Sequence, residues 1–393
     1  MPSNTKNLAL LFTKVPDRLP VPGEHIAVKD VGPFDLDQEL PANGMILETL
    51  YVSFDPYLRG LLRDPSVKSY LPAIPLGNAI SAATLSRVLR SKLEGYAEGD
   101  VVRLLLPIQQ YNLHVAKPPK EGEAQWERPF KVPNPNDSQL DIRQYLGALG
   151  MPGLTAYSSL YEIGKPKAGE IIVVSSAAGA VGQLVGQLAK HEGLTVFGSV
   201  GSDDKLDFII NELGFDGGWN YKKEPSTKEV IGRLVREHKE KKGEKVPEET
   251  GNGEGGIDIF YDNVGGEQLD GAMETLNLFG RSSHEPFLTI SITSIVECGQ
   301  ISQYNLPPSE RYPIRNTFLT VVKRLTMTGF MVGDANMGPK HAKSHLENVS
   351  KWLRDGSFKA KVHETVGMEN AAEAFSGMLK GENFGKAILK VKV

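Results

Sequence analysis

Small residues recur at a fixed spacing in the segment Ser175–Lys190, directly after a short β-branched run. Ala177, Gly179 and Gly182 match the positions of the glycine fingerprint that links a strand to a helix in dinucleotide-binding proteins. Small side chains let the backbone approach a pyrophosphate closely, and the amino end of a helix presents N–H groups and a positive dipole. The pattern predicts a dinucleotide site. The alternative is a tight turn in a sheet protein that binds no cofactor.

The residues after the next predicted strand indicate which dinucleotide is bound. NAD enzymes usually have an acid about 20 residues after the glycines, where it binds the ribose hydroxyls. Here Gly201 leaves room for a 2′-phosphate, Lys205 supplies a positive charge, and Tyr221 supplies a hydrogen-bond donor. These residues favour NADPH over NADH. Asp203 and Asp204 leave an alternative open, because either can bind ribose or cap the following helix.

Other catalytic chemistries find little support. Of eight histidines only His341 and His345 have a helical i, i+4 spacing, and that pair lacks the glutamate of a zinc-binding helix motif. A solvated helix face is the better interpretation of the pair, and no metal site is predicted. The one cysteine, Cys298, excludes an intramolecular disulfide framework and is expected to be a buried strand residue.

A hydride donor without a metal needs a hydrogen-bond donor that stabilises negative charge on a substrate oxygen. A tyrosine phenol suits this role because it donates a hydrogen bond and stays protonated at neutral pH. Tyr57 in SFDPYLRG and Tyr304 in ECGQISQYN are the candidates. Taken alone, each is equally compatible with an ordinary half-buried tyrosine.

Alternating strand and helix patterns must position these residues. The helix after the glycine turn has an apolar stripe, and short apolar runs separate further helical segments. The predicted strands are Ile171–Val174, Leu194–Gly198, Trp219–Tyr221, Ile257–Tyr261, Phe287–Val296 and Leu325–Phe330. Such alternation predicts an α/β fold with a doubly wound parallel sheet.

The flanking parts of the chain have a different texture. Up to about residue 140, Pro- and Gly-rich sequence separates short β-like runs such as Met45–Phe54, which predicts a β-rich domain. After Tyr221 a charged segment is predicted to be a surface insertion, with an amphipathic helix at Val230–Val235 and then a solvated loop. From about His341 the pattern gives a helix, a short basic strand, a second helix and a closing strand at Ala387–Val393. Periodicity does not show whether this portion joins the parallel sheet or returns to the first domain.

Composition limits the partners. The 393 residues have a formal net charge of −4, which provides no field to recruit nucleic acid. No apolar run is long enough to span a membrane, and the first residues lack an export signal. We therefore expect a cytoplasmic protein that acts on a small molecule, without a nucleic-acid or membrane partner.

Several motifs together resemble the zinc-independent medium-chain dehydrogenase/reductase superfamily, most closely its prostaglandin reductase (leukotriene B4 12-hydroxydehydrogenase) and alkenal double-bond reductase family. They are Val52–Gly60, Gly150–Tyr157, Ser175–Lys190, Gly201–Lys205, Phe260–Gly266, Cys298–Asn305 and Glu382–Leu389. The resemblance implies a GroES-like catalytic domain at 1–145, a Rossmann NADPH-binding domain at 146–340 and a C-terminal return at 341–393 that completes the catalytic domain. It also implies an active site between the domains and a homodimer.

The resemblance further implies a role for each matched position. The pyrophosphate would contact Ala178, Gly179, Ala180, Val181 and Gly182, and the 2′-phosphate would contact Lys205 and Tyr221. The ribose and nicotinamide would contact Asn263, Cys298, Gly299, Ile301, Tyr304, Phe330, Met331, Val332 and Asn383. Tyr57 and Tyr304 would face the substrate. The chain departs from the family in its longer segment Ser282–Ser294 and in the charged insertion, either of which can reshape the pocket or a subunit contact.

The resulting hypothesis is an NADPH-dependent ene reductase. Hydride would pass to the β-carbon of an α,β-unsaturated aldehyde or ketone, and Tyr304 or a cofactor ribose hydroxyl would hold the enolate oxygen. One alternative is quinone or carbonyl reduction on the same scaffold. Another is a protein that binds NADPH without catalysis.

Overall fold

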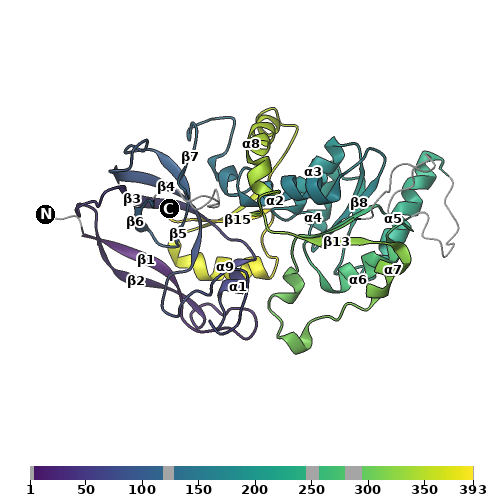
Figure 1. Cartoon of the computed structure of the whole chain (residues 1–393), viewed down its shortest axis with the longest axis horizontal. Coiled ribbons are helices and arrows are strands. Elements are labelled where there is room, and N and C mark those ends of the chain that lie inside the picture. The colour runs from purple at the N-terminus through teal and green to yellow at the C-terminus, as the bar shows by residue number, and fades with distance from the viewer. Residues whose placement is uncertain (1–3, 118–127, 245–255, 279–293, 393) are drawn as a thin grey trace. The chain divides into compact units, whose positions relative to one another are not determined.

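The computed structural model describes residues 4–117, 128–244, 256–278 and 294–392, and these form two compact units (Figure 1). The first unit combines Met1–Met151 with Lys361–Val393, and the second is Pro152–Ala360. The second unit therefore extends to Ala360 rather than to residue 340. The reason is that helix α8 (Gly338–Arg354) packs on helix α2 (Met151–Ser159), and that Gln187 exchanges two hydrogen bonds with the backbone of Lys359.

The first unit is rich in β-structure. Its strands are β1 (Asn4–Phe12), β2 (Ile26–Asp35), β3 (Gly44–Ser53), β4 (Ser81–Ser91), β5 (Val101–Pro107), β6 (Tyr111–Val115), β7 (Phe130–Lys131), β14 (Val362–Val366) and β15 (Lys386–Lys390). The closing strand β15 pairs with β14 on one side and with β3 on the other. This pairing answers the question that periodicity left open, because the last strand belongs to the β-rich unit.

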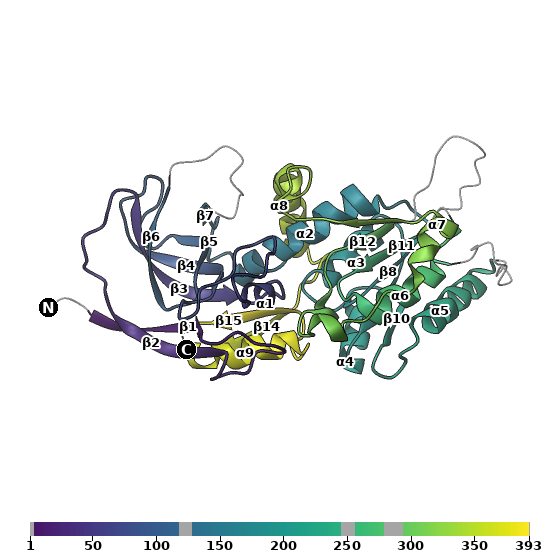
Figure 2. The ribbon, with the colours of Figure 1, turned by 60° about the horizontal axis from the view of Figure 1, so that its bottom comes forward.

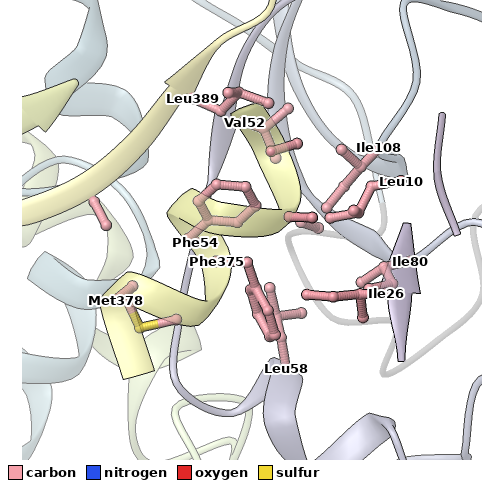
Figure 3. Packing of buried hydrophobic residues seen from close by; sticks show 14 of the residues in the cluster. Leu10, Ile26, Val52, Phe54, Leu58, Ile80, Ile108, Phe375, Met378 and Leu389 are labelled. Atoms are coloured by element: carbon pink, nitrogen blue, oxygen red, sulfur yellow. The ribbon is translucent and has the colours of Figure 1, made fainter. Parts of the chain in front are cut away.

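A buried cluster holds the first unit together (Figure 3). Helix α1 (Leu58–Leu61) and helix α9 (Ala371–Leu379) both contribute to it. Phe375 of α9 packs edge-on against Phe54, with ring centroids 5.7 Å apart. The other labelled members are Leu10, Ile26, Val52, Leu58, Ile80, Ile108, Met378 and Leu389. Residues from both ends of the chain thus share one core.

The second unit contains the predicted parallel sheet. Its strands among the described residues are β8 (Ile171–Val174), β9 (Thr195–Val200), β10 (Gly217–Asn220), β11 (Ile259–Asp262), β12 (Ser294–Glu297) and β13 (Thr326–Gly329). Their order in space is β10-β9-β8-β11-β12-β13, and every neighbouring pair is parallel. The strand order reverses between β8 and β11, and ligands bind outside the carboxyl ends of the strands at such a switch point.

Helices cover both faces of this sheet. They are α2, α3 (Gly182–His191), α4 (Asp203–Asp207), α5 (Thr227–Lys242), α6 (Gly266–Thr275), α7 (Leu319–Lys323) and α8. Ile171, Val173, Phe260 and Ile295 lie in one cluster with residues of α5 and α6, which pack side by side (Figure 2). Successive residues of a strand point to opposite faces of the sheet. The strand residues that alternate with these four therefore point to the other face, where α2 and α3 lie.

Several predicted elements agree closely with these bounds. The strand Ile171–Val174 is β8, and the apolar positions Val230, Ile231, Leu234 and Val235 are buried in α5. The prediction for Phe287–Val296 is tested only from residue 294, because residues 279–293 lie outside the described part of the chain. The departure at Ser282–Ser294 falls almost wholly there, as does most of the loop predicted after α5. No helix in the described part of the chain has the length and apolar character to cross a bilayer.

Candidate active site

The glycine turn joins β8 to α3, as its spacing predicts. Ser176 adopts a left-handed backbone conformation with φ of 51°, and the Ala177 N–H donates to the carbonyl of Ser199 over 2.9 Å. At Gly182 a Cβ atom would lie 2.4 Å from the carbonyl oxygen of Ser176, so no larger residue fits there without moving the turn. The Gln183 N–H donates to the Gly179 carbonyl and the Leu184 N–H donates to the Val181 carbonyl, so the start of α3 is tied to the turn. The turn therefore has the close backbone approach that a pyrophosphate requires, and Ala178, Gly179, Ala180 and Val181 line it.

Two further glycines, which the fingerprint did not single out, hold α3 against the sheet. A Cβ at Gly186 would lie 1.9 Å from the ring of Phe215, and one at Gly198 would lie 2.5 Å from the Cβ of Ala177. Glycine inside a helix or strand costs stability unless close packing requires it. These two glycines therefore allow α3 and the turn to pack closely against the sheet. In the sequence, the glycine inside the helical pattern at Gly186 was the feature from which this close packing could have been predicted.

The ends of β9 and β10 bring together the residues predicted to bind a 2′-phosphate. A Cβ at Gly201 would lie 3.2 Å from the Tyr221 hydroxyl, so the tyrosine lies directly beside the glycine. Burial and the nearby ammonium of Lys222 lower the pKa of Lys205. Lys205, Lys222 and the Tyr221 phenol follow the carboxyl ends of β9 and β10. Such donors suit a phosphate group, which accepts charge-assisted hydrogen bonds.

The two aspartates after Gly201 have different surroundings. The Asp203 carboxylate accepts hydrogen bonds from Lys223 at 2.5 Å and from the Asn220 side chain at 2.9 Å. These bonds lower the pKa of Asp203 and tie it to β10 and the turn after it. Ser202, rather than an aspartate, occupies the N-cap position of α4. The alternative that Asp203 binds ribose therefore competes with two hydrogen bonds.

Asn263 is held at the switch point between β8 and β11. Its backbone N–H donates to the Ser175 hydroxyl over 2.7 Å, and its side-chain amide donates to the Ser175 carbonyl over 2.8 Å. The Ser175 hydroxyl in turn donates to the buried carboxylate of Asp262 over 2.8 Å. Asp262 was not predicted as a functional residue, although it lies in the motif FYDNVGG. Through the Ser175 hydroxyl, the Asp262 carboxylate fixes the position of the Asn263 backbone.

The segment 298–304 follows β12 and lies against 262–265. The N–H groups of Cys298 and Gly299 donate to the Asp262 carbonyl, and the Ile301 N–H donates to the Asn263 carbonyl over 3.2 Å. The Tyr304 hydroxyl accepts the Gln300 N–H over 3.1 Å. This bond uses an oxygen lone pair of Tyr304 and not its proton. Tyr304 is half-buried and its hydroxyl lies beside Gly299, where a Cβ would be 3.1 Å away.

Cys298 comes just after β12 and is half-buried, so the prediction of a buried strand residue is inaccurate in both respects. Burial raises the pKa of its thiol to about 12, although interaction with the Tyr261 hydroxyl works in the opposite direction. Tyr261 itself is fully buried, and its hydroxyl lies 2.7 Å from the Ser159 hydroxyl of α2. The thiol is therefore protonated at neutral pH and is a poor nucleophile.

Phe330, Met331 and Val332 follow β13 at the same edge of the sheet. Ten of the predicted cofactor positions thus adjoin the carboxyl ends of β8, β11, β12 and β13. They are Ala178, Gly179, Ala180, Val181, Asn263, Cys298, Gly299, Phe330, Met331 and Val332.

The remaining two predicted residues, Tyr57 and Asn383, belong to the first unit. Tyr57 precedes α1 and packs against the core cluster, and burial together with the Asp55 charge raises the pKa of its phenol. A buried ion pair lies next to it in sequence, because the ammonium of Lys386 is 2.8 Å from the Asp55 carboxylate. The Asn383 amide donates to the Gly385 carbonyl over 2.6 Å.

His341 and His345 do not form a solvated face, contrary to the sequence interpretation. His345 is 3% exposed, and both rings lie within 6 Å of the Tyr157 ring of α2. The His341 ring is 2.6 Å from the Glu162 carboxylate. Among the described residues no group of three or more His, Cys, Asp and Glu side chains is arranged to hold a metal ion.

A doubly wound sheet with a glycine turn at its switch point, in one chain with a β-rich unit, defines a two-domain dinucleotide-dependent oxidoreductase. Residues 35–120 match the family described as the N-terminal domain of oxidoreductase, and residues 180–350 match the family described as zinc-binding dehydrogenase. The chain belongs to the medium-chain dehydrogenase/reductase superfamily, in its zinc-independent branch. Its two units are accordingly a GroES-like domain and a Rossmann domain.

Individual relatives cover almost the whole chain. It is 44% identical over 386 residues to NADP-dependent oxidoreductase RED1 of Cochliobolus heterostrophus, covering 98% of each protein. It is 33% identical over 351 residues to 2-alkenal reductase (NADP(+)-dependent) of Nicotiana tabacum, covering 89% of this chain and 88% of that one. Among solved structures, CurA of Vibrio vulnificus in complex with NADPH has a TM-score of 0.76 at 27% identity, covering 98% and 99% of the two chains.

Proposed function

We propose that this protein is an NADPH-dependent ene reductase that reduces the carbon–carbon double bond of α,β-unsaturated aldehydes or ketones. The observation that carries the proposal is the Tyr304 phenol, which the segment 298–304 holds beside Gly299 and Asn263 at the switch point of the sheet. The likeness to a 2-alkenal reductase at 33% identity supports the same substrate class.

The chain has the features needed to hold NADPH. The turn Ala178–Gly182 would bind the pyrophosphate, and Lys205 and Tyr221 would bind the 2′-phosphate beside Gly201. The segments that follow β11, β12 and β13 would line the ribose and nicotinamide, together with Asn383. When bound, NADPH supplies the hydride that adds to the β-carbon of the substrate.

The tyrosines would stabilise the negative charge that develops on the substrate oxygen and would supply a proton. As the β-carbon gains a hydride, the carbonyl oxygen becomes an enolate oxygen, and the Tyr304 hydroxyl stabilises it by donating a hydrogen bond. In its bond with the Gln300 N–H the phenol acts as the acceptor, which is compatible with donation from the same hydroxyl. The α-carbon then takes a proton from a tyrosine or from water, which completes a saturated carbonyl product. Tyr57, protonated because burial raises the pKa of its phenol, would contact the substrate.

The direct test is turnover. Purified protein with NADPH and a simple enone should oxidise the cofactor and give the saturated ketone, identified by mass spectrometry. An allylic alcohol as product would identify carbonyl reduction instead. Cofactor binding without oxidation across a panel of enones and enals would identify a non-catalytic protein.

Cofactor selectivity tests the 2′-phosphate site separately. Lys205→Ala should raise the KM for NADPH roughly 10- to 100-fold, the value of one or two charge-assisted hydrogen bonds, and leave the KM for NADH unchanged. Lys228→Ala is the control, because Lys228 binds Glu274 on the surface at 2.7 Å. An unchanged preference for NADPH in the Lys205 variant would reject the role of this lysine.

We also propose that the protein is a homodimer that associates through β13. Among the described residues this strand is the last of the sheet, its side chains bear no charge, and Met327 is 40% exposed. Phe318, Val321 and Val322 of the neighbouring helical segment are exposed as well. An uncharged, open strand edge is a template for pairing, and two identical edges related by a twofold axis satisfy each other.

A further inference from the structure

Glu297 places a second carboxylate beside Asp262 in the candidate site. It is the last residue of β12, and it lies in register with Asp262 of β11 and Gly329 of β13. Paired residues of parallel strands project to the same face. Because Ile295, two residues earlier, packs in the cluster of α5 and α6, Glu297 also points to the α6 face.

The two carboxylates have very different hydrogen-bond partners. Asp262 is fully buried and accepts hydrogen bonds from the Ser175 hydroxyl at 2.8 Å, the Val264 N–H at 2.9 Å and the Gly265 N–H at 2.9 Å. All of these groups donate and lower the pKa of the Asp262 carboxyl, although burial outweighs them and raises that pKa overall. In contrast, Oε1 of Glu297 is buried with no hydrogen-bond partner among the described residues, and Oε2 is 3.5 Å from the Gln300 side-chain nitrogen.

This asymmetry decides where a proton resides. Burial, followed by the charge of Asp262, raises the pKa of Glu297 to about 7, against a smaller lowering by Gln300. Of the other groups near it, Cys298 has a thiol pKa raised to about 12 and is neutral, and β13 contributes the uncharged Gly329. After burial, the Asp262 carboxyl is the largest influence that raises the pKa of Glu297.

Gln300 connects Glu297 to the proposed catalytic phenol. Its side-chain amide faces Oε2 of Glu297, and its backbone N–H donates to the Tyr304 hydroxyl over 3.1 Å. Gln300 is exposed, but its stem lies against Gly265, where a Cβ would be 2.9 Å from its Cγ. The side chain and the backbone N–H of one residue thus contact Glu297 and Tyr304 respectively.

We propose that Glu297 is a positioning residue whose protonation state determines how firmly Gln300 holds Tyr304. The ionised carboxylate accepts the Gln300 amide strongly and fixes the segment 298–304, whereas the protonated acid accepts it weakly. The inference rests on the proposed role of Tyr304 in enone reduction. It predicts that kcat/KM for an enone rises several-fold between pH 6 and pH 8.

The experiment compares the wild-type protein with Glu297→Gln, which is isosteric and cannot ionise. The control is Glu267→Gln, at an exposed position of α6. The first measurement is urea unfolding from pH 5 to pH 8. A carboxyl group whose pKa is raised on folding stabilises the protein at low pH, and this stability is lost as the pH rises. The unfolding constant of the wild type should therefore increase roughly 30- to 100-fold more than that of Glu297→Gln.

The second measurement is the pH profile of kcat/KM, with Gln300→Ala as an additional variant. The rise near pH 7 should be absent in Glu297→Gln and in Gln300→Ala, whereas Gln300→Ala should keep the pH dependence of unfolding. Equal pH dependence of unfolding in the wild type and Glu297→Gln would overturn the proton site. An activity step that persists in Glu297→Gln would overturn the coupling to Tyr304. If no variant turns over an enone at any pH, the proposed function fails. The pH dependence of unfolding still tests whether Glu297 gains and loses a proton.

Discussion

Replacing Lys386 with methionine should destabilise the first unit far more than the loss of a surface ion pair would. The side chains of Lys386 and Asp55 are 2% and 6% exposed, and the ammonium also donates to the Phe54 carbonyl over 2.5 Å. Asp55 is otherwise bound by the Ser53 hydroxyl. Lys386→Met leaves the Asp55 charge buried with one donor, and breaking a buried pair in this way costs about 3–5 kcal/mol.

Urea unfolding followed by far-UV circular dichroism measures this cost at pH 7. Adding Asp55→Asn to Lys386→Met removes the uncompensated charge and should recover most of the loss, since replacing both partners is often close to neutral. The control is Lys392→Met, which breaks the more exposed pair with Glu48 and should cost less than about 1 kcal/mol.

The stabilities of these three variants, compared at one pH, decide whether the pair behaves as described. If Lys386→Met costs no more than Lys392→Met, or if the double variant is less stable than the single one, the reasoning about this pair is refuted.

Three further predictions concern the glycine turn, the thiol and the sheet edge. Gly182→Ala should weaken NADPH binding at least tenfold by fluorescence titration, because its Cβ would lie 2.4 Å from the Ser176 carbonyl; binding equal to that of Gly232→Ala, where space is open, would contradict this. Cys298, with its thiol pKa raised to about 12, should react with a disulfide reagent at pH 7.5 at least tenfold more slowly than free cysteine, and an equal rate would exclude the environment described. Met327→Lys should convert a dimer to a monomer in analytical ultracentrifugation; an unchanged dimer would show that the interface lies elsewhere.

Local patterns predicted much of the Rossmann domain. The strand Ile171–Val174, the turn after it and the buried face of α5 follow from residues close together in sequence, where period and turn chemistry act directly. The placement of Gly201 next to Tyr221 was also accessible, because parallel strands end at one edge of a sheet.

Long-range pairing explains what the sequence could not predict. Nothing near Lys386 indicates that it binds Asp55, because the two residues are 331 positions apart. His341 and His345 have the spacing of a solvated helix face, yet the Tyr157 ring of α2 covers them. The pairing of Asp203 with Lys223 depends likewise on how β9 and β10 meet.

The position of β15 between β14 and β3 has a consequence for biosynthesis. A ribosome makes the first strands early, but the strand that completes their sheet emerges last. The Rossmann domain lies in sequence between the two segments of the β-rich unit, so it is fully translated before that strand appears. Nascent chains should therefore acquire a protease-resistant nucleotide-binding domain first, and a stop codon just before Lys386 would leave the β-rich partner permanently unfinished.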